Sequence, residues 1–524
     1  MDRRPHSRIA NNRSQSPSGS QAKTLIGRRD LLKLTAGVGA AAFGMTGSGL
    51  FVPRINIGRA ADGAELVESE VRSSKDGLLD TTLEASVMAV PVGGGTAIMA
   101  VYDGTLPGPT LRVRPGDTLR IKLVNKLGDL PAGLPADSPF QWTSMGEDGM
   151  MTSDTNLHMH GFHVSPSDNS DNIFTRVMVG ESFQYEYKIP SNHPSGTYHY
   201  HPHVHGVSHN QVFGGLVGAI IIEGDIDHLP GIEGVPERML VLQATQLTPD
   251  GGSVIAQEDA SQKDYLRLVN GQLNPTISIK PGETQRWRVQ NLSVSSTFNL
   301  QLDDHQLHQI AKDGNTLDEV WTRDTIIMGP GERVEVLVQG GAEGSYALRS
   351  VPNATGFTTQ VGRVLATVVS AGAATTPQPL PTTLMPHEDL SALSSDEIDG
   401  NRRITFQIKP PINPRTVTAQ INSHIFDPNR DDQVVRLNTT EEWVIRNASS
   451  QWHPFHIHIN DYQVIAVNGE PLRVRSSEDT TRVPPFGEIT MRTRYLDFPG
   501  RWVYHCHILL HEDHGMMGTI RADA

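Results

Sequence analysis

Residues 500–517, GRWVYHCHILLHEDHGMM, constrain this chain most, because they contain the only cysteine among 524 residues. Cys506 stands between His505 and His507, and the aromatic residues of the segment share the parity of the cysteine. Such alternation predicts a β-strand, whose successive side chains point to opposite faces. Cys506 should therefore point to one face and the two histidines to the other, so that one strand can serve two metal sites.

The cysteine face of this strand carries part of a possible copper site. His511 follows Cys506 by five residues, and Met516 follows His511 by five more. One Cys, two His and a weak axial Met form a blue-copper site, so a second histidine is required. His453, the first histidine of HPFHIH, is the candidate, because the other two histidines of that motif share the opposite parity. A free thiol is the alternative for an isolated cysteine, but histidines on both sides favour a thiolate ligand.

The opposite face needs more imidazoles, and the sequence supplies them in pairs two residues apart. Residues two apart on a strand share a face, so each pair can offer two rings to one cavity. A zinc site would use four ligands at most and would leave the majority of these rings unexplained. The pairs are His158 and His160 in HMHG, His201 and His203 in HPH, His456 and His458 in HPFHIH, and His505 and His507 in HCH.

Together these four segments resemble the four copper-binding motifs of the multicopper oxidases, in particular the three-domain, laccase-like blue copper oxidases of bacteria. The resemblance implies four copper ions in three sites. The type 1 copper would be bound by His453, Cys506, His511 and Met516; the type 2 copper by His158 and His456; and the type 3 pair by His160, His201, His203, His458, His505 and His507.

This resemblance also implies an activity. The enzyme would oxidise a reducing substrate by one electron at the type 1 copper and reduce dioxygen by four electrons to water at the three-copper cluster. Phenols and aromatic amines, as for a laccase, are one substrate class. Cuprous or other metal ions are the alternative, as in copper homeostasis, but the chain has no Met-rich segment. A copper-binding protein or electron carrier without turnover is a third possibility, although a carrier would need only the type 1 site.

Two carboxylates match the places where this family has acids that supply protons to oxygen. They are Asp171, in the sequence NSDN after HMHG, and Glu512, directly after His511. Solvated loop carboxylates are the alternative for both. Other histidines beside the motifs receive no assigned role: His163, His199, His205, His209 and His514. His305 and His308 have no partner motif and are interpreted as structural or surface residues.

An internal repeat predicts the fold class. Residues 102–125 and 268–291 share a strand, a Pro-Gly turn and a second strand, and residues 419–447 form a weaker copy with Asn438 at the turn. Three copies, together with the resemblance, predict an all-β chain of three cupredoxin-like Greek-key β-sandwich domains. The expected domains are residues 62–224, 225–371 and 385–524, with a Pro- and Thr-rich linker at 372–384. Residues 128–155 form a long irregular insertion before the first motif.

The N-terminal region predicts export. Residues 1–61 contain ten lysines and arginines against two aspartates, Asp2 and Asp30, while the whole chain carries a net charge of −14. Within it, GRRDLLKL, with Arg28 and Arg29, resembles a twin-arginine signal peptide followed by a small-residue apolar run; a membrane anchor is the alternative. We therefore expect the twin-arginine export machinery as a partner and the periplasm as the location. The acidic remainder argues against nucleic acid as a partner, and a monomer is favoured.

Overall fold

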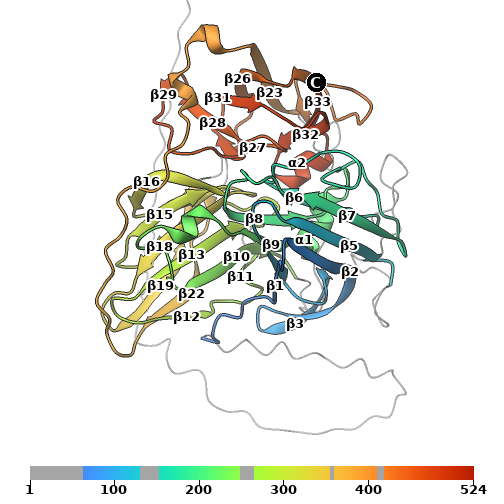
Figure 1. The fold of residues 1–524 in the computed structure, drawn as a ribbon. Helices are drawn as coiled ribbons and strands as arrows, with labels where there is room; N and C mark the ends of the chain where they lie inside the picture. Colours follow the sequence, from blue (N-terminus) through green and yellow to red (C-terminus); the bar gives the residue numbers. More distant parts are fainter. Residues whose placement is uncertain (1–62, 130–152, 248–264, 355–358, 410–417) are drawn as a thin grey trace, which may run out of the picture. The chain divides into compact units, whose positions relative to one another are not determined.

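The computed structural model describes residues 63–129, 153–247, 265–354, 359–409 and 418–524 (Figure 1). All of these belong to one compact unit, Ile55–Ala524. The predicted signal segment, 1–61, and most of the predicted insertion, 128–155, lie outside the described residues. No helix in the described part is long and apolar enough to cross a membrane.

The described chain is built from strands, which confirms the predicted all-β, cupredoxin-like fold class. Its α-helices are two short ones, α1 (Ser208–Gly214) and α2 (Leu509–Asp513). Strand β5 (Thr118–Lys126) shows why strands form: Leu119, Ile121 and Leu123 are fully buried, while the alternating residues Arg120 and Lys122 face outward. A sheet with one face in a core and one toward water produces this pattern.

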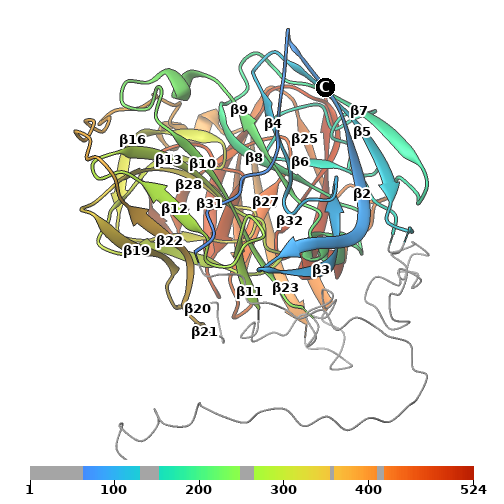
Figure 2. The same cartoon turned by 90° about the horizontal axis from the view of Figure 1, so that it is seen from below.

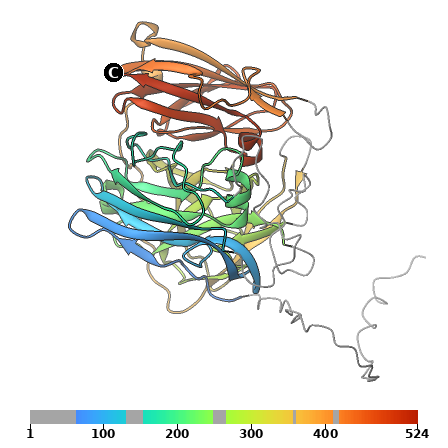
Figure 3. The ribbon, with the colours of Figure 1, turned by 90° about the vertical axis from the view of Figure 1, so that its right-hand side faces the viewer.

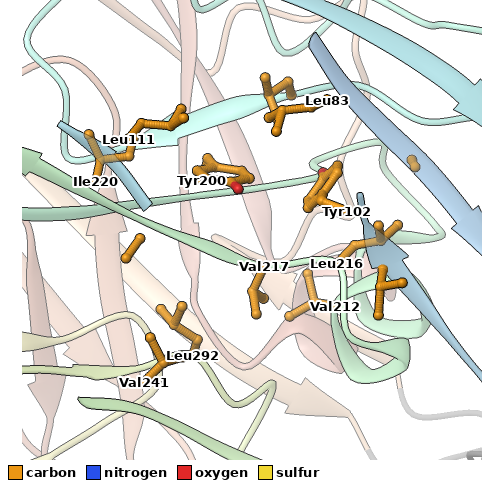
Figure 4. Close-up of a cluster of buried hydrophobic side chains, with 14 of the residues drawn as sticks. Leu83, Tyr102, Leu111, Tyr200, Val212, Leu216, Val217, Ile220, Val241 and Leu292 are labelled. Carbon is orange, nitrogen blue, oxygen red and sulfur yellow. The ribbon is translucent and has the colours of Figure 1, made fainter. Parts of the chain in front are cut away.

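The first sandwich consists of two sheets around one core. Its strands are β1 (Val71–Ser73), β4 (Gly108–Val113), β9 (Gly218–Ile222), β8 (Gly196–His201) and β6 (His158–His160) in one sheet, and β3 (Gly95–Tyr102), β2 (Leu78–Val92), β5 and β7 (Ser182–Lys188) in the other. Figure 4 shows Tyr102 and Tyr200 in this core with Leu83 and Leu111. The cluster continues to Val241, so it also joins this sandwich to the next.

The second sandwich has its own core around Trp287. Its six-stranded sheet contains β11 (Leu266–Val269), β10 (Glu237–Thr245), β13 (Thr284–Asn291), β18 (Arg333–Gln339), β15 (Leu307–Lys312) and β16 (Asn315–Arg323); the five-stranded sheet contains β12 (Thr276–Ile279), β22 (Arg363–Ser370), β19 (Gly344–Ser350), β14 (Phe298–Leu302) and β17 (Ile326–Met328). Near the start of the described chain, Glu65 forms an isolated bridge with Thr276 of this sandwich.

The third sandwich, coloured orange to red in Figure 3, packs around Trp443 and Trp502. Its six-stranded sheet contains β24 (Thr418–Ile421), β23 (Gly400–Lys409), β26 (Thr439–Asn447), β31 (Glu488–Tyr495), β28 (Tyr462–Val467) and β29 (Glu470–Pro471); the five-stranded sheet contains β25 (Gln433–Arg436), β33 (Met517–Asp523), β32 (Gly500–Cys506), β27 (His453–Ile457) and β30 (Thr480–Val483). The domain boundaries predicted from the sequence stay predictions.

The sequence repeat corresponds to a repeated strand order. The strand sets β3-β2-β5-β7, β11-β10-β13-β18 and β24-β23-β26-β31 each pair in the order antiparallel, parallel, antiparallel. The turn of each copy contains a residue with positive φ: Gly116 at 90°, Gly282 at 78° and Asn438 at 62°. Asparagine tolerates this conformation better than most residues, which explains how the third copy manages without Pro-Gly.

Candidate metal centre

Two antiparallel strand pairs carry the histidine motifs. On β6 and β8, His158 pairs with His201. Strands β27 and β32 of the third sandwich are drawn in Figures 1 and 2. On this strand pair, His456 pairs with His505, while Cys506 pairs with Phe455. Because neighbours on a strand point to opposite faces, Cys506 enters the apolar core of the third sandwich, whereas His505 faces the imidazoles of the first. The structure thus separates the sulfur from the flanking rings, as the alternation predicts.

The cysteine group is small and buried. His453 Nδ1 lies 3.3 Å from Cys506 Sγ, and His511 Nδ1 lies 3.7 Å from it. His453 Nε2 is 2.7 Å from Ser449 Oγ, and a proton donated there leaves the Nδ1 lone pair free toward the sulfur. Met516 is fully buried in the same cluster, and its carbonyl accepts a hydrogen bond from the amide of Cys506.

The cysteine has the environment of a metal ligand rather than of a reactive thiol. Burial raises the pKa of Cys506 above its usual range, so that without a cation the sulfur would stay protonated. A coordinated metal removes that proton and supplies the missing positive charge. Two imidazoles and a thiolate, with a methionine nearby, are a donor set that suits copper.

The eight histidines of the other motifs form one buried cluster between the first and third sandwiches. His203 Nε2 and His458 Nε2 lie 3.1 and 3.4 Å from His505 Nε2. His160 Nδ1 lies 3.2 Å from His507 Nε2. The buried ring nitrogens without a hydrogen-bond partner among the described residues include Nε2 of His158, His201 and His456. Such convergent nitrogens fit metal ions that accept their lone pairs.

The protonation state of the cluster supports the same interpretation. Burial, followed by the proximity of other imidazoles, lowers the pKa well below its usual range for His158, His160, His203, His458, His505 and His507. Neutral imidazoles are the form that binds metals. The residues present therefore fit a group of copper ions.

Acceptors on the far ring nitrogens orient several of these histidines. Nδ1 lies 2.9 Å from an oxygen in three of them, leaving Nε2 toward the cluster. The acceptors are the Asp171 carboxylate for His158, the Pro202 carbonyl for His201 and the Asp479 carbonyl for His456. In His160 the roles of the two ring nitrogens are exchanged: Nε2 lies 3.1 Å from Asp479 Oδ1, which leaves Nδ1 toward the cluster. Such partners select the tautomer and the ring orientation of metal ligands.

Both predicted carboxylates lie beside cluster imidazoles. Asp171 is buried and also accepts a hydrogen bond from the amide of Met159; burial raises its pKa to about 8. The oxygens of Glu512 lie 3.2 Å from His505 Nδ1 and 3.5 Å from His203 Nδ1. Burial, followed by the charge of Asp513, raises the pKa of Glu512 well above its usual range. Neither residue is a solvated loop carboxylate.

Sequence reasoning missed one arrangement that supports the cluster. Arg333 of β18 donates two hydrogen bonds to Asp479, with distances of 2.7 and 2.6 Å, and both side chains are buried. Burial opposes ionisation, but the Arg333 guanidinium outweighs it and holds the pKa of Asp479 below its usual range. At Gly161, where φ is 85°, an added Cβ would lie 2.4 Å from Arg333. Neither Arg333 nor Asp479 belongs to a histidine motif, so the sequence offered no signal for them.

The remaining histidines fall into two groups. His199 lies in the cluster, close to His160, His201 and His507. The others are placed outside it: His205 contacts Phe426, His209 lies on α1, His163 contacts Asp497, and His514 follows α2. His305 and His308 bond within the second sandwich, at Asp303 and Thr322 respectively.

A cavity of about 140 Å³ reaches the cluster at His203. Phe174 and Ile173 of the first sandwich and Phe426 and Met517 of the third contribute its apolar lining. Among the cluster histidines, only the buried His203 borders this cavity, which opens between the two sandwiches.

Comparison with known proteins agrees with this geometry along the chain. Three family models, each described as multicopper oxidase, match residues 85–153 and 148–226, 236–372, and 397–524. The chain belongs to the multicopper oxidases. It is therefore an oxidoreductase, and its family implies copper, dioxygen and a reducing substrate.

Individual multicopper oxidases resemble the chain at moderate identity. It is 28% identical over 432 residues to multicopper oxidase mco of Staphylococcus haemolyticus, covering 80% of this chain and 83% of that protein. It is 27% identical over 466 residues to a laccase of Bacillus stratosphericus, and the match covers 79% of this chain and 89% of that protein. Among solved structures, a Campylobacter jejuni multicopper oxidase described as a metallo-oxidase has a TM-score of 0.71 at 25% identity, covering 90% and 96%. McoA of Aquifex aeolicus, at 23% identity, has a TM-score of 0.73, covers 88% and 100%, and supports the fold.

Proposed function

We propose that this oxidase holds four copper ions and acts as a laccase-like enzyme. His453, Cys506, His511 and Met516 would hold the type 1 copper; His158 and His456 the type 2 copper; and the other six cluster histidines the type 3 pair. This proposal depends on one observation: neighbouring side chains of β32 point to opposite faces. Cys506 contacts His453 on one face, while His505 contacts His203 on the other. When bound, copper accepts and transfers single electrons, which none of these side chains can do alone.

The chain's own residues connect and orient the two groups. Cys506 and His505 are adjacent, so a short covalent path joins the sulfur to the cluster. Asp171 and Glu512 lie against His158 and His505, where each carboxyl can hold a proton and deliver it inside the buried site. Because four electrons and four protons convert dioxygen to water, buried acids at the cluster serve the reduction.

Phenols and aromatic amines are the proposed substrates. An oxidase for cuprous ions would gain from soft thioether ligands, and the sequence has no Met-rich segment. The adjacent pair Met516 and Met517 is fully buried, so it offers no exposed thioether. The related proteins include both a laccase and a metallo-oxidase, so oxidation of cuprous ions is the second candidate.

Oxygen uptake by copper-loaded protein tests this function. We expect uptake that depends on a phenol, four coppers per chain, and a blue colour that Cys506→Ser abolishes while three coppers remain. Faster turnover with cuprous ions than with any phenol would favour the metallo-oxidase. Absence of uptake with either donor would leave only a carrier.

We also propose that the chain is exported as a folded monomer to the periplasm by the twin-arginine machinery. The support is the sequence around Arg28 and Arg29. Replacing both by lysine should retain the enzyme in the cytoplasm, whereas the same change at Arg3 and Arg4 should not. Equal export of the two variants would contradict the proposal.

A further inference from the structure

His199 is a cluster histidine to which no motif gives a role. It lies on β8 directly opposite His160 of β6, and the two rings stack with centroids 4.1 Å apart and planes at 19°. His201, two residues further along β8, has its ring centroid 5.4 Å from that of His199. Strand alternation therefore gives His199 the same face as the predicted ligand His201.

The ring nitrogens of His199 are close enough to share a metal ion with three neighbours. One nitrogen from each of His160, His199, His201 and His507 lies within 4.8 Å of the other three. Imidazole–metal bonds in proteins are about 2.0 Å long, so a modest contraction of this group would bring all four to one ion. Among the residues that the structure describes, the comparable group on the other side of the cluster has three members, His203, His458 and His505.

Packing alone does not explain a histidine at this position. His199 is 1% exposed, and its Nδ1 has no hydrogen-bond partner in the described part of the chain. A buried polar atom without a partner costs about 1–3 kcal/mol, whereas a purely aromatic ring could stack on His160 without that cost. A metal ion that accepts the lone pair of His199 removes the penalty.

We propose that His199 is a fourth imidazole ligand of the copper held by His160, His201 and His507. The two coppers of the type 3 pair then differ, one bound by four imidazoles and the other by three. This inference rests on the proposed copper cluster and adds a ligand to it. A fourth donor should make its copper the slower of the pair to dissociate.

Anomalous diffraction at the copper edge from crystals of the copper-loaded enzyme tests the inference directly. We expect a ring nitrogen of His199 at bonding distance from the copper beside His160, about 2.0–2.5 Å. A separation above about 3 Å in both the oxidised and the reduced enzyme would show that the ring only stacks, and would overturn the proposal. Absence of copper from the whole cluster would instead overturn the proposed function.

Copper retention gives an independent readout. In His199→Phe, which keeps an aromatic ring on His160, one cluster copper should pass to a chelator on the order of tenfold faster, while the blue colour of the cysteine site persists. His308→Phe removes a histidine of the second sandwich and should match the unaltered protein. Equal rates of copper release from His199→Phe and His308→Phe would contradict a ligand role for His199.

A third variant, His199→Gln, tests whether a polar side chain without a ring restores copper retention. Full restoration of copper retention in His199→Gln would count against ligation by the imidazole.

Discussion

Single side chains decide which metal chemistry each group can support. Met516 and Met517 are adjacent and both buried, but their side chains belong to different apolar clusters. Met516 shares its cluster with Cys506, whereas Met517 packs with Val503 and Phe426. Of the two methionines, only Met516 is therefore placed to influence the cysteine site.

Substitution of Met516 tests the axial position. An axial thioether tunes the potential of a blue-copper site, and Met516→Leu removes that donor while keeping a similar volume. We expect a higher reduction potential in a redox titration of the blue band. Met517→Leu is the matched control and should leave the reduction potential unchanged. A lower reduction potential in Met516→Leu would contradict the assignment of Met516 as the axial ligand.

Glu512 tests proton supply. Glu512→Gln keeps a side chain of the same size beside His505, but the amide cannot deliver a proton. Copper content should stay full, while stopped-flow reoxidation of the reduced enzyme by dioxygen should slow by about 10²-fold. Asp303→Asn serves as the control, because Asp303 pairs with Arg349 at the surface of the second sandwich, away from the cluster. Unchanged reoxidation in Glu512→Gln would exclude the role.

His193 predicts a pH dependence of stability that is separate from the metals. Its Nε2 accepts from the amide of His163, its Nδ1 lies 2.9 Å from the Pro194 carbonyl, and burial lowers its pKa to about 3. Below pH 6.5 the unfolded chain binds a proton that the folded chain does not, so stability falls as pH falls from 6.5 toward 3.

The matching measurement is denaturant unfolding at pH 7 and pH 5. With the unfolded pKa near 6.5, His193 should account for about 2 kcal/mol of the loss in unfolding free energy between these pH values. In His193→Gln the loss should be smaller by that amount. An identical loss in both proteins would show that His193 takes up a proton in the folded state.

At the scale of elements, strands from all three sandwiches meet at the cluster. β6 and β8 supply imidazoles from the first sandwich, and β27 and β32 supply them from the third. The second sandwich supplies none of these rings, yet Arg333 of β18 holds Asp479, which contacts His160 and His456. The second sandwich therefore positions ligands through an ion pair.

Arg333→Lys tests this contact. Lysine keeps the charge but cannot make two parallel hydrogen bonds to the carboxylate. We expect the cluster's copper affinity, measured by chelator competition, to fall by about 10–100-fold, while the cysteine site keeps its colour. Arg349→Lys is the control, because Arg349 makes a similar two-point pair with Asp303 at the surface. Equal affinities in the two variants would remove the positioning role.

At the scale of the whole molecule, a buried charge network joins the first and second sandwiches. Glu335 of β18 accepts from Thr197 of β8 at 2.6 Å and from Arg288 of β13 at 2.7 Å. It also binds Arg286, and both arginines are almost fully buried. Because a buried charge needs compensation, this carboxylate is required where the two sandwiches meet.

Glu335→Gln should therefore destabilise the molecule. Removing one partner of a buried ion pair costs about 3–5 kcal/mol, so the thermal midpoint of unfolding should fall clearly. Glu319→Gln is the control, since Glu319 pairs with Arg473 and Arg475 at the surface, where solvent-exposed ion pairs contribute little to stability. Similar thermal midpoints for Glu335→Gln and Glu319→Gln would show that the buried charge network does not determine the stability of the molecule.

The sequence by itself determined the fold class and brought forward the histidine motifs and the cysteine that the structure gathers into two groups. A side-chain period of two fixes which residues share a face of a strand, so HCH, HMHG, HPH and HPFHIH could be assigned to faces without coordinates. The repeat likewise indicated three similar sandwiches, because Pro115 and Pro281 mark equivalent turns. These are local properties of the backbone, which short segments encode.

Only the tertiary structure decided which side chains support those groups. Asp479 and Arg333 are 146 residues apart, and their contact exists because the second and third sandwiches pack together. The position of His199 against His160 likewise depends on the pairing of β6 with β8. Local periodicity carries no information about which distant strands pair or which sandwiches pack together. That packing fixes the tautomers, the burial and the number of imidazoles in the cluster.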